Sequence, residues 1–365
     1  MAGLIIFYLI LFPFGKLTSV LPDLLVIIIC LWGAKKYKLK INNFLFVGLF
    51  SLLFSLTLFK LPEILIGVLY FLRFASYLLF SGVIYQKFGK NKTKIDFIFN
   101  SLIIIGISIA IFGWIQYFIF PDLRALKDLG WDDHYFRLVS TFLDPAFTGI
   151  LLVLAEILVV IKTIEKKTRL NFILNIFLII TIAFTYSRGS FLSLLFAFAY
   201  LFWKFKSKLI PFLLVLFVVS VFVLPKQSGG EGVNLTRTHS ITDRFENYKE
   251  SLILIQKSPI FGIGFDNVCV AKEKFLRDKD ITSHACSGLD NSLLFILATT
   301  GIVGLMIFTQ SILRIVNKTT QDIYGVALIA SFVAVFVHGM FTNTFFYNFI
   351  LGYLAILIGI TRLKD

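Results

Sequence analysis

The segment that decides the fold spans residues 170–203 and reads LNFILNIFLIITIAFTYSRGSFLSLLFAFAYLFW. Arg188 is the only charged residue in it. An α-helix rises about 1.5 Å per residue and needs about 20 mainly apolar residues to cross the hydrocarbon of a bilayer. The segment therefore predicts two paired membrane spans, at 170–186 and 189–203, joined by a short turn at Ser187, Arg188 and Gly189.

The rest of the chain has the same character. Of its 365 residues, 58% are hydrophobic and 15% are charged, whereas soluble domains are about 45–50% apolar and about 25% charged. No soluble core of this length could bury the surplus of Phe, Leu and Ile, so lipid must cover it. The predicted fold class is all-α integral membrane: a polytopic helical bundle of about 12 transmembrane helices with a long outer loop. The apolar runs lie at 3–14, 18–34, 41–59, 64–85, 96–119, 146–164, 170–186, 189–203, 208–224, 291–313, 323–341 and 345–361. The first run is short enough to be re-entrant, which leaves a count of 11 or 12.

Short basic clusters set the predicted orientation. They follow only the even-numbered runs: Lys35, Lys36, Lys38 and Lys40; Lys87, Lys90, Lys92 and Lys94; Lys162, Lys166, Lys167 and Arg169; Lys204, Lys206 and Lys208; Arg314 and Lys318; Arg362 and Lys364. Because Lys and Arg concentrate in cytoplasmic loops, 12 spans place both termini and all six clusters in the cytoplasm. The net charge of +14 is accounted for by these loops, so it does not indicate nucleic-acid binding.

The runs divide the chain into five parts. Transmembrane helices are expected at 1–119, 146–224 and 291–365, and outer segments at 120–145 and 225–290. The second outer segment mixes cations and anions, as a soluble surface does, and long connections are exempt from the charge rule. Cys269 and Cys286 both lie in it and could form a disulfide or remain free thiols; Cys30 lies inside a span and is expected to pack there.

Three polar residues on the outer side are candidates for chemistry. Arg188 could bind a phosphate through its planar guanidinium, or it could be an interfacial anchor that snorkels. Arg244 lies near the start of an amphipathic helix, where it could hold an anion beside exposed N–H groups or pair with Asp243 or Glu246. Asp290 could be a general base in a partly desolvated mouth, or simply the N-cap of the next span.

The predicted amphipathic helix has Asp243 and Glu246 as an N-cap with its partner three positions on, and it ends at Ser258 and Pro259. Its apolar face comprises Phe245, Tyr248, Leu252 and Ile255. Such a face predicts a helix lying flat on the membrane or over a cavity.

Other polar residues allow two interpretations each. Arg73 and Glu156 lie near the middle of spans, face the bundle interior and could pair with each other. His338 is either a hydrogen-bonded core histidine or a proton carrier, and His284 is either catalytic or a solvated loop residue. Gly301 and Gly304, three apart on one helical face, indicate close helix packing. Residues 262–264 are only a turn signal, and no zinc spacing, Walker loop or dinucleotide fingerprint is present, so no metal or cofactor is expected.

Four motifs in order resemble those of one family. Residues 137–149, RLVSTFLDPAFTG, resemble R-x-x-G-T-F-x-x-P-N; residues 185–190, TYSRGS, resemble the S-R-G-A turn; Arg244 and Tyr248, followed by PIFGIG at 259–264, resemble R-x-x-x-W and P-x-x-G-x-G. Asn291 and Gly301 match H-N-x9-G-x-x-G, with Asp290 where the ligases have histidine. The chain thus resembles the O-antigen ligase and O-antigen polymerase superfamily of membrane glycosyltransferases.

The resemblance implies a GT-C-like helical bundle in the bacterial inner membrane with its active site facing the periplasm. It implies a metal-independent, inverting transfer of a glycan from undecaprenyl pyrophosphate to an acceptor sugar. Arg188 and Arg244 would then bind the pyrophosphate and stabilise the leaving group, and Asp290 would be the base, with His284 and His338 as reserves. Arg137, Arg73, Asn291 and Tyr248 are further candidates for substrate binding.

The acceptor and the class of protein stay open at this point. Asp290 in place of histidine favours a polymerase, which extends a lipid-linked repeat unit, over a ligase, which uses lipid A–core. A chain-length regulator is a further candidate partner, besides the bilayer itself. A lipid-linked oligosaccharide flippase would place its charges along a central path instead of at an outer mouth, and a non-catalytic scaffold would not need Arg188 and Arg244.

Overall fold

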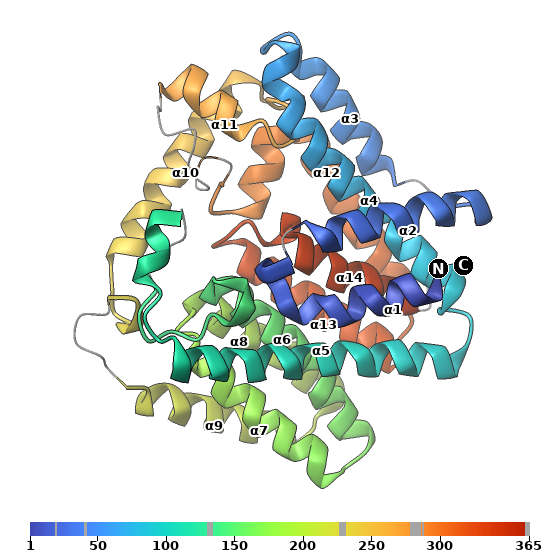
Figure 1. Ribbon diagram of the computed structural model, residues 1–365, viewed down its shortest axis with the longest axis vertical. Coiled ribbons are helices and arrows are strands. Elements are labelled where there is room, and N and C mark those ends of the chain that lie inside the picture. The colour runs from blue at the N-terminus through green and yellow to red at the C-terminus, as the bar shows by residue number, and fades with distance from the viewer. Residues whose placement is uncertain are drawn as a thin grey trace.

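The computed structural model describes residues 1–18, 20–39, 42–129, 134–225, 231–277, 286 and 288–361, and within them the chain is helical (Figure 1). The α-helices are α1 (Ala2–Leu11), α2 (Leu21–Lys36), α3 (Asn43–Ser55), α4 (Leu65–Lys87), α5 (Lys92–Ile119), α6 (Pro145–Glu165), α7 (Arg169–Phe184), α8 (Arg188–Phe205), α9 (Leu209–Val223), α10 (His239–Lys257), α11 (Val268–Ala271), α12 (Ser292–Lys318), α13 (Ile323–Gly339) and α14 (Asn348–Ile360). Shorter turns of helix are η1 (Phe12–Thr18), η2 (Leu61–Ile64), η3 (Arg124–Leu129), η4 (Ser140–Phe142), η5 (Glu231–Val233), η6 (Lys272–Leu276) and η7 (Thr344–Phe346).

Length and composition support a membrane bundle. Within the described part of the chain, four helical segments are long and apolar enough to cross a membrane: Leu61–Lys87, Lys92–Ile119, Pro145–Glu165 and Ser292–Lys318. Six more apolar helices have 10–17 residues: Ala2–Thr18, Asn43–Ser55, Arg169–Phe184, Leu209–Val223, Ile323–Gly339 and Asn348–Ile360. The all-α membrane class is therefore confirmed, while the count of 12 crossings and the five-part division stay predictions.

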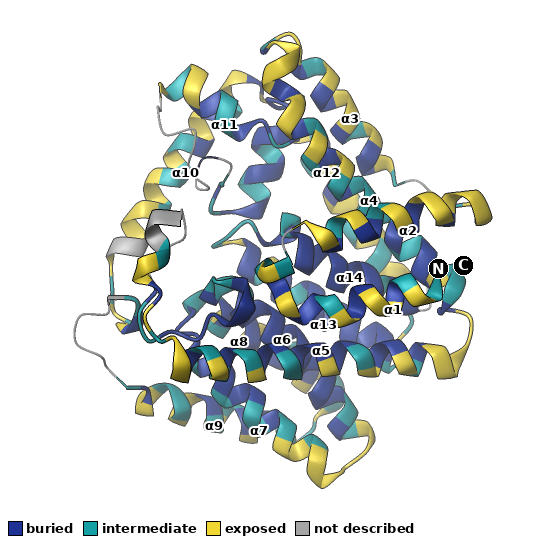
Figure 2. Ribbon diagram, viewed as in Figure 1, coloured by how far each residue is buried: buried dark blue, intermediate teal, exposed yellow. Residues whose placement is uncertain are grey.

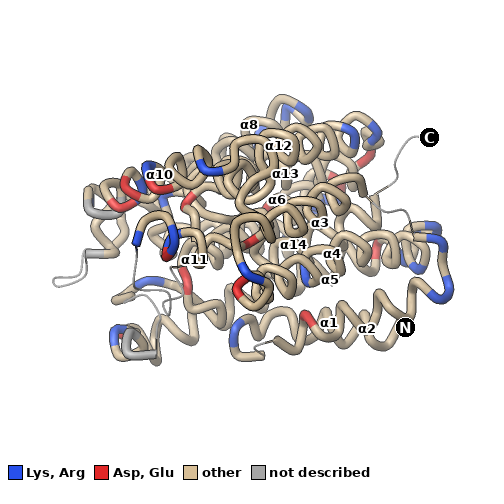
Figure 3. Tube along the Cα trace, turned by 90° about the horizontal axis from the view of Figure 1, so that it is seen from above, with Lys and Arg blue, Asp and Glu red and all other residues tan. Residues whose placement is uncertain are grey.

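The helices pack around α6, α13 and α14. α6 is buried along most of its length and contacts α5, α7, α8 and α13, while α14 packs on α4. Figure 2 shows buried residues in these central helices and exposed residues on the peripheral ones. Large apolar side chains on the periphery, such as Phe222 at 85% and Phe118 at 73% exposure, are expected to face lipid. Charged residues lie mainly towards two ends of the bundle, with few between them (Figure 3).

One end of the bundle brings six helices together, and we call it the mouth. α6, α8, α12 and α14 begin there, α13 ends there, and α10 runs along its edge (Figure 1). Contacts join these elements: Phe147 stacks on Tyr347 with ring centroids 3.8 Å apart, and the Tyr248 hydroxyl of α10 donates to the Met340 carbonyl. The predicted outer residues Arg188, Arg244 and Asp290 all lie at this end.

α12 is broken at Gly301, whose φ of 66° and ψ of −172° are not helical. The segment Pro259–Gly264 fills the break with backbone hydrogen bonds: Ile263 N–H to the Ala298 carbonyl (2.9 Å), Gly264 N–H to the Thr299 carbonyl (3.1 Å) and Ile302 N–H to the Pro259 carbonyl (2.9 Å). A Cβ on Gly301 would lie 2.1 Å from the Ile260 carbonyl oxygen, and one on Gly262 would lie 2.3 Å from the Thr299 carbonyl carbon. Gly301 therefore serves a loop–helix junction and not the helix–helix packing expected for it.

The predicted start of α10 needs correction, and some of the predicted cytoplasmic residues lie outside the described part of the chain. α10 begins at His239, with Thr238 at the N-cap position, and not at Asp243, because the helical turn continues upstream of the charged pair. Phe245 and Leu252 on its predicted apolar face are 61% and 52% exposed. Lys40, Arg362 and Lys364, which belong to the predicted cytoplasmic clusters, lie outside the described residues.

The predicted Arg73–Glu156 pair is wrong. Arg73 of α4 forms its ion pair with Asp23 of the neighbouring helix α2, at 3.5 Å. Glu156 is fully buried in the apolar centre of α6, and neither carboxylate oxygen has a hydrogen-bond partner among the described residues. The prediction failed because the position of a residue along its apolar run gives its depth in the membrane but does not show which helices are neighbours.

Two of the cysteines form a disulfide, and Cys30 is a free thiol. Cys269 and Cys286 are disulfide-bonded, which ties α11 to the segment that precedes α12. Cys30 is buried and its thiol donates to the Ser76 carbonyl at 3.1 Å, so it packs between α2 and α4 as expected.

Candidate active site

Arg188 is positioned by the turn between α7 and α8. The Ser187 side chain accepts a hydrogen bond from Ser190 N–H and caps α8, so Arg188 is the first residue of that helix. Ser, as a short side chain with an acceptor oxygen, is favoured at an N-cap. The Arg188 guanidinium is half-buried and donates to the carbonyls of Arg237 (3.0 Å) and Leu235 (3.4 Å). The residue lies at the mouth, and these two backbone carbonyls compensate part of its positive charge.

Two other arginines bind the backbone of the same turn. Arg137 is 8% exposed and donates to the carbonyls of Thr185 (3.1 Å) and Tyr186 (3.3 Å). Arg237 donates to the Tyr186 carbonyl (3.4 Å) and to the Gly232 carbonyl (2.7 Å). The two guanidinium groups thus join three separate outer segments around the turn that carries Arg188.

Arg244 is set apart from these by its surroundings. It is half-buried in the first half of α10, and its guanidinium lies 6.0 Å from the centre of the Phe341 ring. Among the described residues it makes no hydrogen bond or ion pair, and it repels Arg188 electrostatically. Two guanidinium groups that approach each other in a partly desolvated mouth favour an anion between them.

α10 is fixed over the mouth by polar contacts. The Asn247 side chain accepts from Asp290 N–H at 2.8 Å, and the Tyr248 hydroxyl donates to the Met340 carbonyl at 2.6 Å. Burial, the largest cause, raises the pKa of Tyr248, and Asp290 adds to the rise while Asn291 and Arg244 oppose it. The phenol therefore stays protonated and donates at neutral pH.

Asp290 and Asn291 differ in their tasks. The Asn291 side chain accepts from Leu293 and Leu294 N–H and donates to the Met340 carbonyl at 3.2 Å, so it is the N-cap of α12 and ties α12 to α13. Asp290 precedes it, is half-buried and acts electrostatically on Tyr248, as Arg244 does. The motif-based candidate base thus lies next to the arginine pair.

His338 lies at the end of α13 and is fully buried. Its Nδ1 is 2.7 Å from Thr344 Oγ1, and its Nε2 has no hydrogen-bond partner among the described residues. Gly189, which follows Arg188, packs beside this imidazole: a Cβ there would lie 3.4 Å from Cδ2 and 3.6 Å from Nε2, in ordinary van der Waals contact. His284 lies outside the described residues.

The structure adds two residues that the sequence did not single out. Arg237 is one, and His134 is the other: it is 8% exposed, and its Nε2 has no partner among the described residues. Burial lowers the pKa of His134 to about 3, and the charges of Arg137 and Arg237 add to this. His134 is therefore neutral at physiological pH. Neither residue has a sequence signal, because each gains its role only from segments that meet in the fold.

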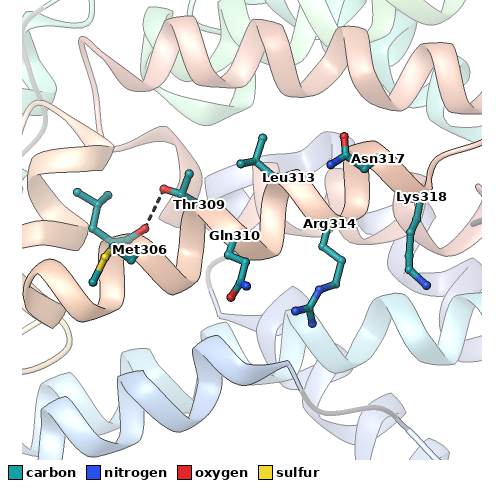
Figure 4. A pocket seen from close by; sticks show the side chains of 8 residues that line it. Met306, Thr309, Gln310, Leu313, Arg314, Asn317 and Lys318 are labelled. Atoms are coloured by element: carbon teal, nitrogen blue, oxygen red, sulfur yellow. Dashed lines mark hydrogen bonds between the residues drawn. The ribbon is translucent and has the colours of Figure 1, made fainter.

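A groove lies elsewhere, on α12. It has a volume of about 690 Å³ and is lined by residues of the second half of α12: Leu305, Met306, Thr309, Gln310, Leu313, Arg314, Asn317 and Lys318 (Figure 4). Asp290 lies at the opposite end of this helix, so the groove does not belong to the mouth. Among the described residues, no three His, Cys, Asp or Glu side chains are grouped to hold a metal ion.

The fold and the mouth together define a helical membrane protein in which arginine side chains gather at one end of the bundle. Residues 173–309 match the family model described as O-antigen ligase, which confirms the resemblance to the O-antigen ligase and polymerase superfamily. The match includes Arg188, Arg244 and Asp290, and it indicates a membrane glycosyltransferase-like function of the ligase or polymerase type. No curated protein matches the chain.

The contacts of Arg137 give a prediction. Substitution Arg137→Ala removes two charge-assisted hydrogen bonds to buried carbonyls, each worth about 1.5–3 kcal/mol, so we expect a lower unfolding temperature in detergent. If Arg137 also binds substrate, as its motif suggests, the KM for the donor will rise in protein that remains folded at the assay temperature. The matched control is Arg314→Ala, which removes an arginine from the second half of α12, away from the mouth. It should change neither the unfolding temperature nor the KM for the donor.

Proposed function

We propose that the protein is an inverting, metal-independent glycosyltransferase that moves a glycan from undecaprenyl pyrophosphate to an acceptor sugar on the periplasmic face of the bacterial inner membrane. The observation that carries this proposal is the pair Arg188 and Arg244. They come from two elements far apart in sequence, lie at one mouth, and repel each other in the absence of an anion. A pyrophosphate between them would relieve that repulsion.

The reaction requires that the negative charge on the leaving group be stabilised. When the bond between the anomeric carbon and the phosphate oxygen breaks, negative charge grows on the pyrophosphate. Preorganised cations in a site with little water stabilise this charge in the transition state more than in the ground state. The Arg244 guanidinium lies 6.0 Å from the centre of the Phe341 ring and has no hydrogen-bond partner among the described residues. It is therefore available to stabilise the charge on the leaving pyrophosphate.

The acceptor in this proposal is a second lipid-linked repeat unit, so the protein acts as a polymerase. Asp290 where the ligases have histidine supports this choice over transfer to lipid A–core. The motif offers Asp290 as a candidate for the base, with His338 and His284 as reserves, and in this proposal Arg137, Arg73, Asn291 and Tyr248 serve substrate binding. Both termini lie in the cytoplasm, and a chain-length regulator is a candidate partner.

One reconstitution tests the function. Purified protein in liposomes receives lipid-linked repeat units, with and without lipid A–core, and the lipid products and released undecaprenyl pyrophosphate are measured. We expect longer lipid-linked chains and one released pyrophosphate for each bond formed. Glycan on the core would show a ligase instead, and movement of the lipid-linked unit across the bilayer without release of pyrophosphate would show a transporter.

A further inference from the structure

A second polar cluster lies at the mouth, around Arg73. Asp23 is held by three donors: the Tyr77 hydroxyl (2.8 Å), the Asn348 side-chain amide (3.1 Å) and Arg73 (3.5 Å). Because its position is fixed in this way, Asp23 in turn fixes Arg73. The guanidinium also lies 4.3 Å from the centre of the Tyr70 ring and is 28% exposed. Arg73 is therefore a preorganised and accessible cation.

The opposite side of this cluster is aromatic and charged. Tyr347 stacks flat on Phe147, and the Lys16 ammonium lies 5.5 Å from the centre of the Tyr347 ring. Lys16 interacts electrostatically with Arg73, Asp23 and Asp144, and so does Tyr347. Aromatic faces beside a few fixed polar groups are typical of small-molecule sites.

The N-terminus of α6 connects the two clusters. Asp144 caps this helix by accepting from Ala146 N–H at 2.6 Å, and the Ser190 hydroxyl donates to the Ala146 carbonyl at 3.3 Å. Ser190 lies two positions after Arg188, so the N-terminal turn of α6 contacts the helix that carries Arg188.

Asp266 lies in a tight turn beside α4, the helix that carries Arg73. Its φ is 55° and that of Gly264 is 98°, and Asn267 anchors the turn by donating to the Ser55 hydroxyl at 3.1 Å. The turn packs against Gly67 of α4, where a Cβ would lie 2.6 Å from the Phe265 carbonyl oxygen. Gly67 lies on α4 fewer than two turns before Arg73, and Asp266 interacts electrostatically with Arg73. A left-handed backbone at a non-glycine residue is strained and is often found at functional sites.

We propose that the Arg73 cluster binds the acceptor sugar and that Asp266 takes the proton from its attacking hydroxyl. This inference rests on the proposed function. The acceptor O–H bond breaks and its proton passes to the Asp266 carboxylate, while the oxygen forms a bond to the anomeric carbon of the donor. The bond from that carbon to the phosphate oxygen breaks, and undecaprenyl pyrophosphate leaves with the electron pair between Arg188 and Arg244.

The electrostatics support Asp266 for this task. Burial raises the pKa of Asp266 to about 7, and the charge of Arg73 limits the rise. A base whose pKa is near the working pH combines a useful ionised fraction with a strong pull on the proton.

The test uses Asp266→Asn in the liposome assay. Asparagine tolerates a left-handed backbone, so this variant should fold and should bind donor normally, as measured by retention of labelled donor lipid. We expect kcat to fall by about 10²–10⁴-fold, the range of general-base effects. Asp122→Asn, an exposed acid that pairs with Arg124, is the matched control and should keep full activity.

The pH profile gives a second readout. Wild-type activity should rise with pH through about 7 as Asp266 ionises. Removing the cation in Arg73→Gln takes away the interaction that lowers the pKa, so the rise should move to higher pH and the KM for the acceptor should increase.

The outcomes separate the two proposals. If the wild-type protein releases no undecaprenyl pyrophosphate, the proposed function is wrong. If the wild type is active and Asp266→Asn keeps kcat within about threefold, Asp266 is not the base, whatever its pKa. A large loss in Asp290→Asn together with an unchanged pH profile in Arg73→Gln would return the role to Asp290.

Discussion

Arg244→Ala is expected to abolish glycan transfer while leaving the protein folded. In the structure the guanidinium makes no hydrogen bond or ion pair within the described part of the chain, and it repels Arg188. Its removal therefore takes away one source of strain and should not lower the unfolding temperature. Removing one group that stabilises a developing charge costs about 10²–10³-fold in kcat, and loss of the second cation at the site adds weaker donor binding. The measurement is initial rate of pyrophosphate release in liposomes, together with thermal unfolding in detergent.

Companion variants sharpen this expectation. Arg188→Ala should lose a comparable factor in rate, with a lower unfolding temperature as well, because Arg188 also binds two carbonyls of the outer segment. Arg244→Lys keeps the charge but loses the planar fork, so it should recover only part of the activity. Arg314→Ala is the matched control. Near-normal turnover in Arg244→Ala would remove this residue from the mechanism and, with it, the main support for the proposed function.

Gly301→Ala should give the largest loss of stability. The backbone at Gly301 has a φ of 66° and a ψ of −172°, a region open almost only to glycine, so alanine costs about 1–3 kcal/mol for the conformation alone. The added Cβ would also lie 2.1 Å from the Ile260 carbonyl oxygen and force the segment Pro259–Gly264 away from α12. Since Asp266 follows that segment directly, activity should fall together with stability.

Gly3→Ala serves as the control for this change. A Cβ at Gly3 meets nothing within 4 Å, and alanine is the better helix former by about 1 kcal/mol. Unfolding in detergent should therefore occur at the same temperature as in the wild type or slightly above it. A Gly301→Ala protein as stable as Gly3→Ala would show that the junction between α12 and the loop is not needed for the fold.

The sequence by itself determined the class of the fold and predicted which residues bind the donor. Hydropathy and charge are local properties, so the apolar runs predicted helices, and the order of the motifs at Arg188, Arg244 and Asp290 indicated the family that the match to residues 173–309 confirms. A helix boundary was less secure: α10 begins four residues before Asp243, because capping side chains compete with tertiary contacts.

Only the tertiary structure decided which residues meet. Arg73 pairs with Asp23 and not with Glu156, and Gly301 receives the segment Pro259–Gly264 instead of another helix. His134, Arg237 and Asp266 gain their surroundings from segments that are remote in the chain. The physical reason is that hydropathy sets how deep a residue lies in a bilayer, whereas hydrogen bonds and charge pairs depend on which helices are neighbours around the bundle, and packing alone settles that.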